Sequence, residues 1–81
     1  MMNKVDAEQL YDLEWSLVRA RISAKREWDE VAKFKGELIY DLRYEEVKQL
    51  RASLKFLKGL RKQLVMANLM DYSKMDEKEA V

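Results

Sequence analysis

Hydrophobic side chains in the first half of the chain fall into two rows with helical spacing. The first row consists of Leu10, Leu13, Leu17, Ala20, Ala24, Trp28 and Val31, and the second of Tyr11, Trp15, Val18 and Ile22. Steps of three and four residues place side chains on one face of an α-helix. At about 100° of rotation per residue, the two rows lie roughly 150° apart around the helix axis. The pattern therefore predicts a first helix, over about 6–40, that is apolar on two sides.

A second helix is predicted over about 45–70. Its apolar row consists of Val47, Leu50, Leu54, Leu57, Leu60 and Leu64. This row is rotated by about 100° relative to Leu38 and Leu42, which still continue the first row. The chain must therefore turn between the two helices, and we place the turn at 40–44. A turn at Gly36, where glycine can take the left-handed cap conformation, is the alternative.

Two long helices with a short connection predict an all-α fold, namely an antiparallel two-helix hairpin. Residues 1–5 are expected to form a flexible start, 6–70 the hairpin and 71–81 a flexible acidic tail. One neighbouring helix can cover only one apolar row of the first helix, and an 81-residue chain has little sequence left to cover the other. We therefore expect the hairpin to complete a helical bundle, by dimerisation or with a different protein.

The composition narrows the class of protein. The chain contains no cysteine and no histidine, which removes the commonest nucleophiles, bases and soft metal ligands. It also lacks a glycine-rich phosphate-binding loop, so we expect no enzymatic activity, no cofactor and no metal site. The net charge of +1 gives no overall attraction to nucleic acid or membrane. The longest uncharged stretch, 63–70, is far shorter than the roughly 20 residues of a membrane span, and the polar start does not resemble a signal peptide. A cytoplasmic location is expected.

The second row of the first helix is the candidate partner-binding surface. It comprises Tyr11, Trp15, Val18 and Ile22. Tyrosine and tryptophan are enriched at binding hot spots because they bury a large area with few rotatable bonds. Burial of four such side chains contributes on the order of 6–10 kcal/mol before the costs of association. The alternative is that the row forms an internal core face of a bundle.

A basic face on the second helix is the other candidate surface. It comprises Lys48, Arg51, Lys55, Lys58, Arg61 and Lys62. Such a ladder can meet an acidic protein or follow a phosphate backbone. It can equally be a solvated surface that forms salt bridges with the first helix, in which case Glu8 and Asp12 should lie near Arg61 and Lys62.

These features together predict a small non-enzymatic protein–protein interaction module. It would act as a regulator or inhibitor by occupying a surface of a larger protein, and in size and composition it is similar to the accessory proteins of phages and mobile elements. One alternative is a helical-hairpin dimer that binds RNA or DNA through the basic face. A second alternative is a small structural subunit of a larger assembly.

Overall fold

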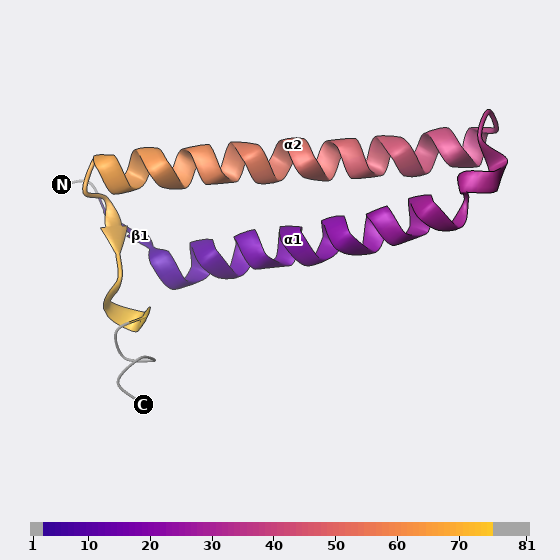
Figure 1. Cartoon of the computed structure of the whole chain (residues 1–81). Coiled ribbons are helices and arrows are strands. Elements are labelled where there is room, and N and C mark those ends of the chain that lie inside the picture. The colour runs from indigo at the N-terminus through magenta and orange to yellow at the C-terminus, as the bar shows by residue number, and fades with distance from the viewer. Residues whose placement is uncertain (1–2, 76–81) are drawn as a thin grey trace.

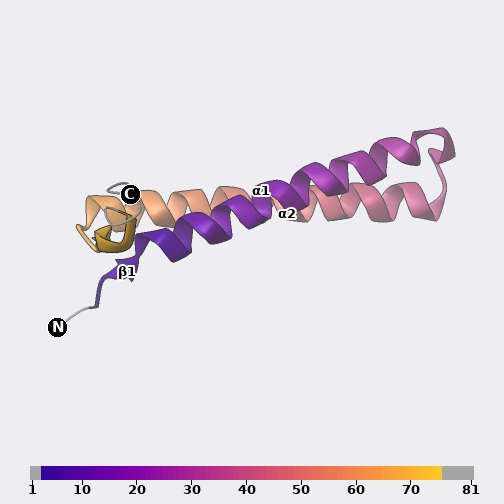
Figure 2. The same ribbon diagram turned by 90° about the horizontal axis from the view of Figure 1, so that it is seen from below.

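A computed structural model describes residues 3–75 of the 81-residue chain. The elements in order are β1 (Val5–Asp6), α1 (Ala7–Glu30), the 3₁₀ turn η1 (Ala32–Phe34), α2 (Leu38–Met66) and β2 (Met70–Asp71). Figures 1 and 2 show α1 and α2 side by side, joined at one end by the turn and closed at the other by the strands. The chain is mostly helical, as predicted, but the short parallel pairing of β1 with β2 was not predicted.

The molecule is one helix thick. It measures 52 × 30 × 15 Å, and a helix with its side chains is about 10–12 Å across. Both broad faces of the helix pair are therefore open to solvent. Among the described residues, neither helix has an apolar stretch long enough to cross a membrane.

The first helix begins at a side-chain cap. Asp6 has an extended backbone conformation, and its Oδ1 accepts a hydrogen bond from the Glu8 N–H at 3.0 Å. This bond satisfies one of the amide groups that a helix start leaves without an intrahelical partner. The same aspartate also accepts a 3.0 Å bond from the Lys74 Nζ, so the start of α1 is tied to the segment that follows β2.

The position of the turn corrects the predicted helix boundaries. Helix α1 ends at Glu30 rather than near residue 40, and α2 begins at Leu38 rather than near residue 45. Gly36 lies in the connection with φ of +93°, a conformation that residues with a Cβ rarely adopt. The glycine therefore marks the reversal of the chain, and the predicted turn at 40–44 is wrong.

The end of α2 leads the chain back to the start of α1. Asn68 takes a left-handed conformation, with φ of 56°, and its N–H donates to the Val65 carbonyl while the Leu69 N–H donates to the Leu64 carbonyl. This pair of bonds is a Schellman motif, in which asparagine replaces the usual glycine. The Leu69 carbonyl then accepts from the Val5 N–H at 2.7 Å.

Two predicted termini are corrected by this closure. Residue 5, assigned to the flexible start, belongs to β1, and residue 71, assigned to the tail, belongs to β2. Met70 is buried, and Met75 packs against the same cluster of apolar side chains. The remainder of the predicted tail, 76–81, lies outside the described residues.

The core lies along the contact between α1 and α2. Its buried apolar residues are Ala7, Leu10, Ala24, Val47, Leu54, Leu57 and Met70. Near the turn, the Trp28 ring packs against Tyr40 and Tyr44, with ring centroids 5.8 and 5.3 Å apart. The apolar row predicted for α2 does face α1, although Leu60 remains 39% exposed.

Helix α1 is rotated relative to the sequence-based expectation. Leu13 and Ala20, which belong to the first apolar row, are exposed, whereas Glu14 is buried with only 8% of its surface accessible. The stripe that faces α2 therefore overlaps the first predicted row, from which Leu10 and Ala24 are buried, and is displaced toward the second row. Neither row is fully covered.

Candidate functional site

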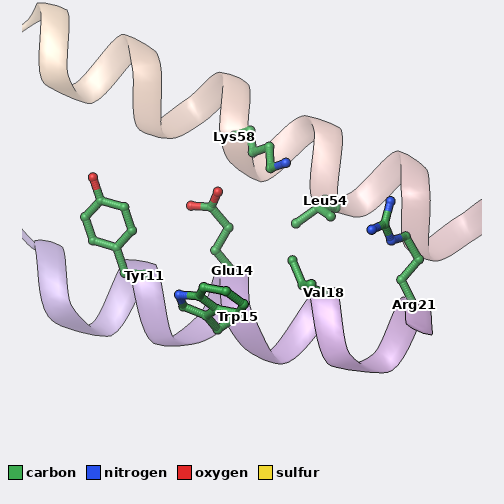
Figure 3. Close-up of a pocket in the computed structure, with 7 residues that line it drawn as sticks. All are labelled: Tyr11, Glu14, Trp15, Val18, Arg21, Leu54 and Lys58. Carbon is green, nitrogen blue, oxygen red and sulfur yellow. The ribbon is translucent and has the colours of Figure 1, made fainter. Parts of the chain in front are cut away.

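A groove of about 380 Å³ runs along one open face of the helix pair. It is lined by Tyr11, Glu14, Trp15, Val18 and Arg21 from α1 and by Leu54 and Lys58 from α2. Figure 3 shows that Val18 and Leu54 approach each other from the two helices and form its floor. Because Tyr11 and Arg21 are ten residues apart on one helix, the groove extends about 15 Å along the helix axis.

The predicted partner-binding row forms one wall of this groove. Trp15 is 61% exposed and Ile22 is 45% exposed, whereas Tyr11 and Val18 are half-buried against α2. Ile22 does not line the groove itself, but it follows Val18 by one helical turn in the same row. The four residues thus share one face, and the two exposed side chains, Trp15 and Ile22, lie at its outer edge.

An ion pair between the helices fixes the position of the groove wall. The Arg61 Nε donates to one carboxylate oxygen of Glu14 at 2.8 Å, and the Arg61 NH2 group donates to the other at 3.2 Å. This forked geometry is the most specific one available to an arginine and a carboxylate. The Glu14 carboxylate raises the pKa of Arg61, and the guanidinium also lies 5.2 Å from the centre of the Tyr11 ring.

Part of the predicted basic face borders the same groove. A second hollow of about 260 Å³ is lined by Arg21, Arg51, Leu54, Lys55 and Lys58, and it shares Arg21, Leu54 and Lys58 with the first. Lys48 and Lys62 are exposed but line neither hollow. Arg61 is occupied by Glu14. The structure therefore joins the two predicted surfaces, but only through three of the six basic residues.

The charges around these hollows are not balanced. Within residues 3–75, the ion pairs involve Lys25, Arg43, Arg61 and Lys74. None of these pairs includes a cation that lines the second hollow. The expected salt bridge between the acidic start of α1 and Arg61 is present, and its acidic partner is Glu14. The cations that line the second hollow are therefore available to bind an anionic group of another molecule.

Three residues of the site escaped the sequence analysis. Glu14, Arg21 and Leu54 were not recognised as groove residues. A seven-residue spacing links Ala7, Glu14, Arg21 and Trp28, and this spacing also keeps side chains on one face of a helix. A search for apolar rows does not recognise this spacing, because two of the four residues are charged.

The groove combines apolar side chains with the carboxylate of Glu14 and the cations Arg21 and Lys58. Within the described part of the chain, no cluster of acidic side chains could hold a metal ion. Comparison of the chain with known protein families, curated protein sequences and solved structures finds no match.

Proposed function

We propose that the protein is a small non-enzymatic interaction module that binds a larger protein and acts by occupying its surface. The contact is made by the row Tyr11, Trp15, Val18 and Ile22, and the module serves as a regulator or inhibitor. The observation that carries this proposal is the 61% exposure of Trp15 at the edge of an apolar groove.

The exposure of this tryptophan is a cost to the isolated molecule. An indole that leaves water for a close-packed contact contributes on the order of 2–3 kcal/mol. Helix α2 covers the adjacent stripe of α1, and the molecule is one helix thick. A surface on another molecule can therefore cover Trp15 and Ile22 without any change in the fold.

The proposal is tested by removal of these two side chains with a matched control. Trp15→Ala/Ile22→Ala deletes the outer edge of the row, whereas Phe56→Ala/Leu60→Ala deletes two exposed apolar side chains of α2. Both variants should retain the helical circular dichroism of the wild type. A partner captured from the native host should be lost with the first variant and kept with the second. Equal capture by both variants would refute the proposed contact.

Binding of RNA or DNA remains the second candidate. It is favoured by the uncompensated cations Arg51, Lys55 and Lys58, which are able to contact phosphates. Phe56, the aromatic residue within this part of α2, lines a further hollow together with Lys55, so an aromatic ring on which a base could stack lies beside one of these cations. Titration with labelled RNA and DNA at low and high salt distinguishes this candidate, because phosphate contacts weaken steeply as salt rises.

A further inference from the structure

We propose that the groove beside Trp15 accepts an amphipathic helix whose acidic residues lie along the edge facing α2. This inference rests on the proposed function and specifies the chemistry of the partner. It follows from three properties of the groove: its shape, its apolar floor and the distribution of charge along its two walls.

The shape of the groove favours a helical occupant. The groove lies between two neighbouring helices that run side by side for several turns (Figures 1 and 3). A third helix placed over such a seam makes contact with both helices and completes a three-helix bundle. Val18 and Leu54 on the floor, with Trp15 on one wall, provide apolar contacts for the buried face of the incoming helix.

The wall formed by α2 determines the charge of the occupant on that side. Lys58 lines this wall of the groove, and Arg51 and Lys55 line the adjoining hollow, which Arg21 reaches from α1. Glu14, the carboxylate in the groove, is neutralised by Arg61. A helix seated here would therefore gain from aspartate or glutamate residues that flank its apolar face on the α2 side.

The outer side of the wall formed by α1 does not favour either charge on the occupant. Beyond Trp15, the neighbouring exposed positions on α1 are Asp12 and Arg19, one turn before and one turn after it. Their charges are opposite, so the flank of the occupant beyond Trp15 meets no net charge, whereas Arg21 on the inner side of α1 adds to the cations on the α2 side. The structure thus predicts a helix that is acidic on one flank and free of charge preference on the other.

A second copy of this chain is a poorer occupant. A two-fold interface places the same patch on both sides of the contact. Where the two-fold axis of such an interface passes beside α2, Arg51, Lys55 and Lys58 of one copy would lie near the same cations of the other, and like charges across an interface are unfavourable. The same electrostatics attracts an acidic helix of a different protein.

A displayed library of amphipathic helices tests the inference. Each member carries a fixed apolar face about four turns long, and the positions on both flanks are randomised among glutamate, lysine, glutamine and serine. Selection on the wild-type protein should enrich glutamate on one flank only. Lys55→Glu/Lys58→Glu should weaken the selected helices by about tenfold or more and favour lysine-flanked ones. The control Lys33→Glu/Lys35→Glu changes the net charge equally, in the connection between α1 and α2 and outside both hollows, and should have little effect.

Several results would overturn the inference. Binders without a charge bias, or with affinities that Lys55→Glu/Lys58→Glu leaves unchanged, would remove the acidic helix but leave the proposed function intact. Binders that tolerate Trp15→Ala/Ile22→Ala would refute both. The inference also fails if the library yields no binder, if the chain sediments as a dimer that this double alanine variant dissociates, or if RNA or DNA displaces the selected helices.

Discussion

The ion pair between Glu14 and Arg61 leads to a prediction about stability that can be worked out from its geometry. Glu14 is buried, and its side chain is 11% exposed, whereas that of Arg61 is 29% exposed. We consider three variants, namely Glu14→Leu, Arg61→Leu and the double variant that carries both substitutions. Each replacement removes one charge and keeps an apolar side chain in its place, so the three variants and the wild type form a double-mutant cycle.

The loss in the free energy of unfolding depends on which partner of the ion pair is removed. Loss of one member of a fully buried ion pair costs about 3–5 kcal/mol, because the other charge is left unpaired away from water. Glu14 has little access to water, but the gap left by Arg61 admits some, so we expect Arg61→Leu to cost about 2 kcal/mol. Glu14→Leu should change stability by about 0.5 kcal/mol or less, because Arg61 can turn toward solvent and leucine fills a buried position.

The double variant decides whether the pair itself is favourable. An apolar pair of similar volume is often as stable as a buried ion pair, so Glu14→Leu/Arg61→Leu should lie within about 1 kcal/mol of the wild type. The coupling energy is then about 2 kcal/mol. Urea denaturation followed by far-ultraviolet circular dichroism measures all four free energies of unfolding. A coupling energy below about 0.5 kcal/mol, typical of a surface pair, would refute the reasoning.

Three further predictions concern the cap of α1, the two glycines and the strand β2. The ion pair and hydrogen bond with Lys74 lower the pKa of Asp6 in the folded chain, so its contribution to stability is present above the ordinary pKa of 3.8 and is lost as the pH falls through the lowered value. Asp6→Asn keeps a capping oxygen without this charge, and its thermal melting temperature should therefore fall less on acidification than that of the wild type. Melting temperatures that fall equally in both proteins would contradict a contribution of the Asp6 charge. Gly36→Ala should destabilise by about 1–2 kcal/mol because of its positive φ, whereas Gly59→Ala, where no described atom lies within 4 Å of an added Cβ, should stabilise by about 1 kcal/mol; urea midpoints that move in the same direction would contradict the assignment. Met70→Ala should cost about 2–3 kcal/mol in the same assay, because the side chain is 4% exposed, and a cost below about 0.5 kcal/mol would show that β2 is not packed on the hairpin.

The helical content could be predicted from the sequence because it depends on local periodicity. The spacing of Val47, Leu54 and Leu57 on α2 identified a face that is indeed buried. The rotation of α1 could not be predicted in the same way. Hydrophobic periodicity assumes that the stripe in contact is the most apolar one, but here Glu14 occupies a buried position because Arg61, 47 residues away, neutralises it. No local signal reports such a distant partner.

The turn was misplaced for a related reason. Leu38 and Leu42 continue the spacing of the first apolar row, yet they are 73% and 56% exposed in α2. Their phase agrees with the first row by coincidence, since the chain has already reversed at Gly36. The strands were missed because each contains two residues, which is too short for an alternating pattern to be recognised.

The candidate site was predicted in its parts but not in its arrangement. The row containing Trp15 and the cations Lys55 and Lys58 were each recognised on separate helices, and only the three-dimensional structure places them along one groove. The same rotation that buries Glu14 brings this about. If α1 were turned so that Trp15 faced α2, the carboxylate would lose Arg61 and Leu10 would leave the core. The exposure of Trp15 therefore accompanies the rotation of α1 that buries Leu10 and places Glu14 against Arg61.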